Sequence, residues 1–175
     1  PDGTWSNGQT SIGYGDNDDN TILDDMRMNA TNAGYSSIYL RREIVLNNFS
    51  QLDNAVFRLY SDDVCIIYMN GTEIARKNAT WSKNFDDFSN GTVGNADLEG
   101  ATLLANLNVV MHLGTNTLAI HALNTGLTSS DLSIDVSLAK QGIWSFIFDP
   151  DAHDTSNKVV FAGYNVDPRF GAPYS

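Results

Sequence analysis

The stretch from Phe57 to Lys77, FRLYSDDVCIIYMNGTEIARK, constrains the fold of this chain more than any other. It contains three runs rich in β-branched and aromatic residues: Val56–Tyr60, Cys65–Met69 and Thr72–Arg76. Such runs are typical of β-strands, and Asn70-Gly71 between the last two is the strongest short-range signal for a hairpin. Ser61-Asp62-Asp63 is a turn signal between the first two. We therefore expect a three-stranded antiparallel meander.

Further strands are expected on both sides of this stretch. Residues 35–46 and 117–123 are rich in strand-forming residues, and Leu132–Leu138 alternates strictly between apolar and polar residues. Gly114-Thr115-Asn116 reads as a turn. Many short strands, with few credible helices, predict an all-β fold: an antiparallel β-sandwich of the jelly-roll type, which leaves few strand edges exposed.

The C-terminal part differs in composition from the rest. Ile143–Phe148 and Val159–Phe161 are two further candidate strands, and from Asp149 onwards Asp, Pro, Asn and Gly become frequent. We expect a β-sandwich module over residues 1–141, followed by an extension over residues 142–175 that is either a packed-back hairpin or a linker.

The charge balance limits the possible partners. The 175 residues include 21 acidic and 10 basic side chains, giving a formal net charge of −11. Such a surface repels phosphate backbones, so nucleic acid is a poor partner, and anionic membranes and polymers are disfavoured unless a cation bridges. No apolar run approaches the length of a membrane span. We expect a secreted or salt-adapted protein, and the abrupt start at Pro1 suggests a module cut from a longer one.

One cysteine and five sequons add little about the compartment. Cys65 lies inside an apolar run, where a free thiol behaves as a small buried hydrophobe. N-x-S/T sequons begin at five asparagines, which a eukaryotic secretory pathway could glycosylate: Asn29, Asn48, Asn70, Asn78 and Asn90. In a chain rich in Asn and Thr, chance explains them equally well.

Three segments in order resemble a known family. They are IGYGDNDDNT at Ile12–Thr21, SDDVCIIYMNGTEIARKN at Ser61–Asn78, and LGTNTLAIHALNTGLTSSDLSIDVSL at Leu113–Leu138. Together they resemble the galactose-binding-domain-like jelly-roll modules that are appended to secreted bacterial enzymes and surface proteins. The resemblance covers about residues 5–140. At Val64 the chain departs from the family pattern, which has Gly after Asp-Asp, and this puts any borrowed role of Asp62 and Asp63 in doubt.

The resemblance implies a fold and a range of functions. Relatives of this fold include carbohydrate-binding modules, enzyme accessory domains and plain spacers, so fold alone does not select among them. The fold often carries a structural calcium near its first loops. Hard oxygen ligands suit Ca²⁺, and the loop around Asp16, Asp18 and Asp19 offers them, although a solvated acidic turn explains the same residues. Asp62-Asp63 resembles the calcium-and-sugar site of PA14-type lectins. The stronger interpretation is that these two carboxylates accept hydrogen bonds from backbone N–H groups at a turn.

Aromatic residues in loop-like sequence are the candidate sugar contacts. An exposed ring stacks on the apolar face of a sugar, and polar groups at the rim fix its hydroxyls. The long polar segment 78–102 contains Trp81 and Phe85, and the glycine-rich N-terminal stretch contains Trp5 and Tyr14. The alternative for Trp81 is that it plugs one end of the sandwich.

Charged residues supply the remaining candidates. Arg76, close to Glu73, could bind sugar hydroxyls or a carboxylate, or pair with a neighbouring acid across the sheet, and His121 with Asp131 is a second candidate pair. His121 has the opposite parity to Leu118 and Ile120, which favours a structural histidine. A lyase-like catalytic face could be assembled from four residues, although nothing in the sequence selects them: Tyr39, Tyr68, His121 and Arg58.

The expected function is therefore non-catalytic. The sequence favours a carbohydrate-binding module that recognises a polysaccharide or oligosaccharide beside a tethered catalytic domain. The expected sugar contacts are Trp81, Tyr14, Arg76, Trp5, Phe85 and Asp131. A ligand-free spacer domain and a calcium-dependent lectin or adhesin remain as alternatives.

Overall fold

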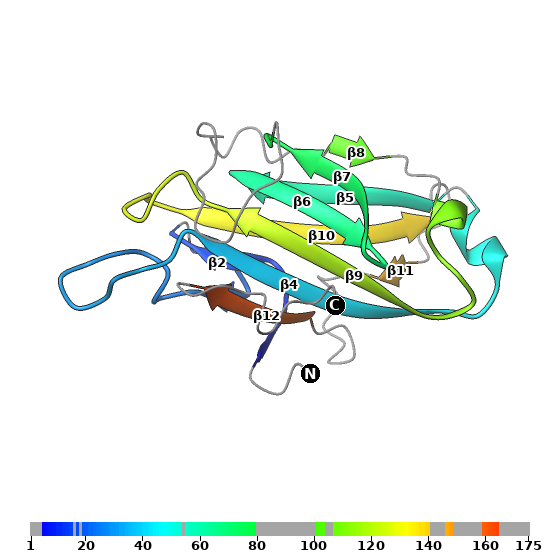
Figure 1. The fold of residues 1–175 in the computed structure, drawn as a ribbon, viewed down its shortest axis with the longest axis horizontal. Coiled ribbons are helices and arrows are strands. Elements are labelled where there is room, and N and C mark those ends of the chain that lie inside the picture. The colour runs from blue at the N-terminus through cyan, green and yellow to red at the C-terminus, as the bar shows by residue number, and fades with distance from the viewer. Residues whose placement is uncertain are drawn as a thin grey trace.

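The described residues of a computed structural model form two β-sheets, A and B, which pack face to face (Figure 1). The structure describes residues 5–15, 17, 19–53, 55–79, 101–103, 107–140, 146–148 and 159–164. In spatial order, sheet A contains β1 (Ser6–Gly8), β12 (Val159–Tyr164), β4 (Ser37–Leu46), β9 (Gly114–Leu123), β6 (Val64–Met69) and β7 (Thr72–Lys77). Sheet B contains β3 (Thr21–Ile22), β2 (Ile12–Tyr14), β10 (Leu132–Lys140), β5 (Ala55–Asp62) and β8 (Ala101–Leu103), and β11 (Phe146–Phe148) pairs with β10.

This architecture confirms the predicted all-β sandwich. Every strand pair in the described residues is antiparallel except β2 with β3, which is parallel. Among the described residues, helical structure consists of two short turns of 3₁₀-helix, Phe49–Leu52 and Leu107–Val109. Within these residues no helix is long and apolar enough to cross a membrane.

Apolar side chains that alternate along the strands form the core between the sheets. In β10 the four apolar residues Leu132, Ile134, Val136 and Leu138 are buried, while the serines and Asp135 between them are only partly so. β4 shows the same period, with Ile38, Leu40, Ile44 and Leu46 buried against sheet B. Because successive strand residues point to opposite faces, the period of two places each set on the inner face.

β6 is buried on both faces of sheet A. Cys65 and Ile67 belong to the core between the sheets, whereas Val64 and Ile66 join Leu123 and Ala79 in a second cluster on the outer face. Strands covered on both faces read as continuous apolar runs instead of alternating ones. This explains why VCIIYM shows no alternation in the sequence.

The predicted three-stranded meander is wrong in one of its two connections. β5 pairs with β10 and β8 in sheet B, whereas β6 pairs with β9 and β7 in sheet A. Ser61, Asp62 and Asp63 are buried, so they form a corner between the sheets and not the exposed tip of a hairpin. The Asn70-Gly71 hairpin is confirmed, with φ of 50° and 79°, because a type I′ turn needs positive φ at both positions.

A second local correction concerns the start of β9. Gly114, Thr115 and Asn116 were expected to form a turn, but they pair with Leu46, Val45 and Ile44 of β4. β9 therefore begins three residues earlier than its apolar run, at Gly114 with φ of 96°.

The C-terminal strands join the sandwich at two separate places. β11 pairs with β10 in sheet B, and β12 lies between β1 and β4 in sheet A. They do not pair with each other, so the described residues do not form the expected C-terminal hairpin. The predicted boundary between residues 141 and 142 stays a prediction.

Candidate functional site

The strand register gathers several loops at one end of the sandwich. In sheet B, Leu132 lies opposite Tyr14. In sheet A, Leu123 lies opposite both Ser37 and Val64. The strands that end or begin at these residues bring together four segments, which we call the loop end: the described residues of 15–20 (15, 17, 19 and 20), and residues 23–36, 61–63 and 124–131. The second and fourth project side by side at the left of Figure 1, where the Met28 N–H donates to Leu127 O at 2.7 Å.

Tyr14, the last residue of β2, is buried next to the loop end. Only 7% of its surface is exposed, its hydroxyl donates to Ser129 O at 3.1 Å, and it accepts from Asn124 Nδ2 at 2.7 Å. Burial raises the pKa of the phenol. The expectation that this ring stands exposed on a loop is wrong, because the hydroxyl has a polar partner that lets the ring enter the core.

The other predicted aromatic contacts divide between the core and the undescribed part of the chain. Trp5 is 8% exposed, so its ring does not present a free face to solvent. Trp81 and Phe85 lie outside the described residues. The last described residue before them is Ala79, directly after Asn78 at the end of β7, and Asn78 Nδ2 donates to Asp63 O at 2.9 Å.

The acidic loop is only partly described. Asp16 and Asp18 lie outside the described residues, and the predicted calcium site is therefore untested. Asp19 is partly buried and its Oδ1 accepts from Ser133 Oγ of β10 at 2.9 Å. Asn20 Nδ2 donates to Thr10 O at 2.8 Å. In the described part of the chain, no group of three His, Cys, Asp or Glu side chains is placed to hold a metal.

The carboxylate of Asp63 supports the corner between the sheets. Asp62 and Asp63 are both nearly fully buried, and Asp63 Oδ2 accepts from the Thr125 N–H at 2.7 Å. This is the turn role that the sequence favoured, a carboxylate bonding a backbone N–H group. Lys77 Nζ donates to Ser61 O at 3.1 Å and ties the end of β7 to the same corner.

Asp131 and Arg76 retain partial exposure. Asp131 Oδ1 accepts from Ser130 Oγ at 2.9 Å, and its backbone carbonyl accepts from Asn124 Nδ2. Arg76 forms a bidentate pair with Glu73, with both N–O distances at 2.6 Å. The acid that pairs with Arg76 is thus in the same strand and not across the sheet, and a sugar would have to use the remaining N–H groups of its guanidinium.

The four residues considered for a catalytic face are split between the sheets. Tyr39, Tyr68 and His121 share the outer face of sheet A, whereas Arg58 belongs to β5 of sheet B. The rings of Tyr39 and His121 stack with centroids 4.3 Å apart, and both are buried. The predicted structural role of His121 fits this position, on the face opposite to Leu118 and Ile120. His121 is not paired with Asp131.

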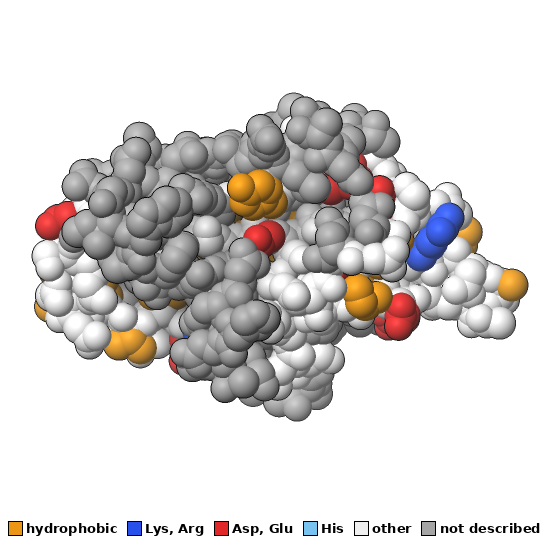
Figure 2. Space-filling view, turned by 180° about the vertical axis from the view of Figure 1, so that it is seen from behind, with side chains coloured by type: hydrophobic (Ala, Val, Ile, Leu, Met, Phe, Trp, Pro, Cys, Tyr) orange, Lys and Arg blue, Asp and Glu red, His pale blue; other side chains and the backbone are white. Residues whose placement is uncertain are grey.

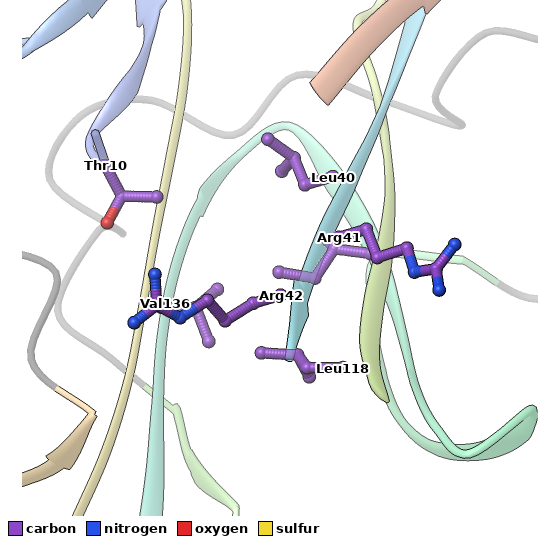
Figure 3. A pocket seen from close by; sticks show the side chains of 7 residues that line it. Thr10, Leu40, Arg41, Arg42, Leu118 and Val136 are labelled. Carbon is purple, nitrogen blue, oxygen red and sulfur yellow. The ribbon is translucent and has the colours of Figure 1, made fainter. Parts of the chain in front are cut away.

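The described residues also line a small pocket between the sheets. Figure 3 shows Arg41 and Arg42 leaving β4 on opposite sides, with Arg42 directed towards Val136. Thr10 and Leu118 line the same space, which has room for about one water molecule. A pocket of this size cannot hold a sugar ring.

The charge seen at the surface agrees with the composition. On the face in Figure 2, Asp and Glu side chains show at several separate places, and the described Lys and Arg side chains are few. No cationic patch gathers among the described side chains that show on this face.

Cys65 gives a direct test of the core. Its side chain is fully buried, and burial raises the pKa of the thiol. We expect Ellman's reagent to react with the native protein at least roughly 100-fold more slowly than with protein unfolded in guanidinium chloride, because only an exposed thiolate attacks. Equal rates in the two states would contradict the burial of β6.

Three asparagines whose side chains nothing in the sequence connects join the family-like segments: Asn70, Asn116 and Asn124. Asn70 Nδ2 donates to Asn116 Oδ1 at 2.8 Å, which links the second segment to the third. Asn124 links the third segment to Tyr14 of the first. The residues that carry the resemblance thus make contacts that hold the fold together. The signal that could have identified them is that each is an asparagine within a family-like segment.

Comparison with known proteins identifies no family. No protein-family model matches the chain, and no curated protein matches it. Among solved structures, the Streptomyces avermitilis α-L-rhamnosidase complexed with L-rhamnose aligns over 79% of this chain and 12% of that chain. The identity is 18% and the TM-score 0.44, values too low to support an argument about function.

Proposed function

We propose that this chain is a non-catalytic carbohydrate-binding module that recognises a polysaccharide through its loop end. In this proposal it belongs to a secreted protein and raises the local substrate concentration for a tethered carbohydrate-active enzyme. The observation that carries the proposal is the strand register. It brings the described residues of 15–20, with 61–63 and 124–131, to the same end as Ala79, after which the chain continues to Trp81 and Phe85.

Trp81 is the proposed stacking platform. It follows Ala79 by two residues, a chain length of at most about 7 Å. Aromatic rings bind the C–H faces of sugars, and carboxylates and amides at the rim bind the hydroxyls. Phe85 from the same segment, with Asp131 and Arg76, supplies the other proposed contacts. Tyr14 and Trp5 drop out of the contact set, because their rings are buried.

The charge favours a neutral glycan. With a formal net charge of −11, the surface repels uronate-rich or sulfated polymers at low ionic strength. For a neutral glycan there is little long-range electrostatic attraction, so aromatic stacking is the main attractive contribution to binding. Binding should accordingly depend weakly on salt.

The test is the substitution Trp81→Ala, measured by affinity electrophoresis on the polysaccharide that a glycan array identifies. We expect retention to fall at least about fivefold, since stacking on an aromatic ring contributes on the order of 1–3 kcal/mol and about 1.4 kcal/mol corresponds to tenfold. Thermal stability should stay within about 0.5 kcal/mol of the parent. Phe49→Ala is the matched control, because this ring is 47% exposed at the opposite end of the sandwich.

Two results would redirect the proposal. If Trp81→Ala retains full binding, the stacking role of this residue is wrong. If no glycan on the array binds, the ligand-free spacer becomes the better description of the domain.

Calcium is the second part of the proposal, with Asp16, Asp18 and Asp19 as ligands. Sub-millimolar chelator should then lower the melting temperature by roughly 5–10 °C, because a ligand present at about 100 times its dissociation constant stabilises by about 2.7 kcal/mol. Excess Ca²⁺ should restore the melting temperature, and the double variant D16N/D18N should show no response to chelator. An unchanged melting temperature of the parent protein would remove calcium, and with it the lectin alternative.

A further inference from the structure

The N-x-S/T sequons whose acceptor asparagine is described do not share one environment in the folded chain. Four of the acceptor asparagines are described: Asn29, Asn48, Asn70 and Asn78. N-glycosylation needs an accessible side-chain amide nitrogen that can give up a proton and carry a large substituent. The hydrogen bonds of these four amides divide them into two pairs.

The amide nitrogens of Asn70 and Asn78 are committed to the fold. Asn70 Nδ2 donates to Val110 O and to Asn116 Oδ1, both at 2.8 Å, so both of its N–H groups are used. Asn78 Nδ2 donates to Asp63 O at 2.9 Å, at the corner between the sheets. A sugar on either nitrogen would replace one N–H and press against the backbone that accepts the bond.

Asn29 presents the opposite arrangement. It lies on the exposed segment between β3 and β4, in a turn closed by backbone bonds with Asn32. Its Oδ1 accepts from the Thr31 N–H and from Thr31 Oγ1, both at 2.9 Å. The carbonyl end of the side chain is therefore held by the sequon itself, and Nδ2 bonds to none of the described residues.

Asn48 repeats this arrangement at the far end of the sandwich. It is exposed, directly precedes the 3₁₀ turn Phe49–Leu52, and its Oδ1 accepts from Ser50 Oγ of its own sequon. Its backbone N–H is bound by Gln51 Oε1 at 3.0 Å, which fixes the residue without using the amide nitrogen. Nδ2 again has no hydrogen bond within the described part of the chain.

We propose that Asn29 and Asn48 are acceptor sites for an N-linked glycan on the folded protein, and that Asn70 and Asn78 are not. The co-substrate is an oligosaccharide carried on a polyisoprenyl diphosphate. Nδ2 attacks the anomeric carbon, the C–N bond forms, and the bond from that carbon to the diphosphate oxygen breaks. The diphosphate leaves with the bonding electron pair, and a base of the transferase takes the Nδ2 proton.

A glycan on Asn48 would also cover apolar surface. Four large apolar side chains are exposed near this end, at 56%, 47%, 77% and 53%: Val45, Phe49, Val109 and Leu113. The two 3₁₀ turns are in contact, and β4 pairs with the start of β9 beside Leu113. Exposed apolar clusters bind the dye ANS, so attachment at Asn48 should lower ANS fluorescence and attachment at Asn29 should not.

The experiment uses folded protein made in the bacterial cytoplasm, carrying Asn90→Gln so that only the four described sites remain. It is incubated with microsomal oligosaccharyltransferase and its lipid-linked donor. The glycan is then removed in H₂¹⁸O with a peptide N-glycosidase, which hydrolyses the side-chain amide and leaves ¹⁸O-labelled Asp. Occupancy is measured by peptide mass spectrometry. Synthetic peptides of the four sequons serve as unfolded acceptors. Thr31→Ala and Ser50→Ala are matched controls that each remove one sequon.

We expect occupancy of Asn29 and Asn48 to exceed that of Asn70 and Asn78 at least tenfold in the folded protein, while the peptides differ much less. Each control should abolish its own site and leave the other unchanged. The proposal is overturned if Asn70 or Asn78 is modified as readily as Asn29 in the folded chain. It is equally overturned if both exposed sites stay unmodified while their peptides are glycosylated.

Discussion

Replacing Asn116 by alanine should destabilise the protein by about 3–4 kcal/mol. The Asn116 side chain is fully buried, and its Oδ1 accepts from His112 N at 2.9 Å and from Asn70 Nδ2 at 2.8 Å. Its Nδ2 donates to His112 O at 2.8 Å and to Gly114 O at 3.0 Å. Each lost bond costs about 1 kcal/mol, and more where a buried partner is left without water. The measurement is urea unfolding, with a fall in melting temperature of roughly 6–15 °C.

Asn108→Ala is the matched control, because Asn108 is an exposed residue of the neighbouring 3₁₀ turn, Leu107–Val109. It should change stability by less than about 0.5 kcal/mol. A double-mutant cycle of N70A and N116A should give a coupling of about 1 kcal/mol, because the two side chains bond each other. Equal losses for N116A and N108A would show that the Asn116 network does not stabilise the fold.

The parts of the fold that were predictable depend on neighbouring residues. The β6–β7 hairpin follows from Asn70-Gly71, because positive φ is a property of those two residues. The strand at Leu132–Leu138 follows from its period of two. Both signals are complete within a few residues, and both are confirmed.

The assignment of strands to sheets is a long-range property and was not predictable. β5 and β6 are separated only by Asp63, yet they belong to different sheets, because β5 finds its partner in β10, far along the chain. Ser61-Asp62-Asp63 has the composition of a hairpin turn and the burial of a corner. What distinguishes the two is Thr125, whose N–H binds the Asp63 carboxylate across 62 residues.

The candidate site shows the same limit. Tyr14 has the loop-like neighbours expected of an exposed ring, but Asn124 binds its hydroxyl from 110 residues away and makes burial favourable. Glu73 stands near Arg76 in the sequence, but residues three apart in a regular strand point to opposite faces, and the register shift in the β6–β7 pairing lets these two side chains meet. Residue type and local context therefore do not identify a partner that depends on how the strands pair.

Replacing Gly13 by alanine should be the most disruptive small substitution in the first family-like segment. A Cβ at this position would lie 1.8 Å from Leu132 O and 2.7 Å from Asp19 Oδ2. The first contact is with backbone of the paired strand, so no side-chain rotation can relieve it. β2 would have to move away from β10, and we expect a loss of about 3 kcal/mol or more in urea unfolding.

Gly126→Ala tests whether this loss comes from the contact or from glycine chemistry in general. No atom lies within 4 Å of a Cβ built on Gly126, and its backbone does not need the left-handed region. That variant should stay within about 0.5 kcal/mol of the parent, or gain slightly from a less flexible unfolded chain. If Gly13→Ala is as stable as Gly126→Ala, the β2–β10 pairing is not as close as the structure has it. If Gly13→Ala is much less stable than Gly126→Ala, β2 has moved away from β10, and Asp19 should lose its bond to Ser133. Any calcium-dependent rise in melting temperature should then disappear in Gly13→Ala.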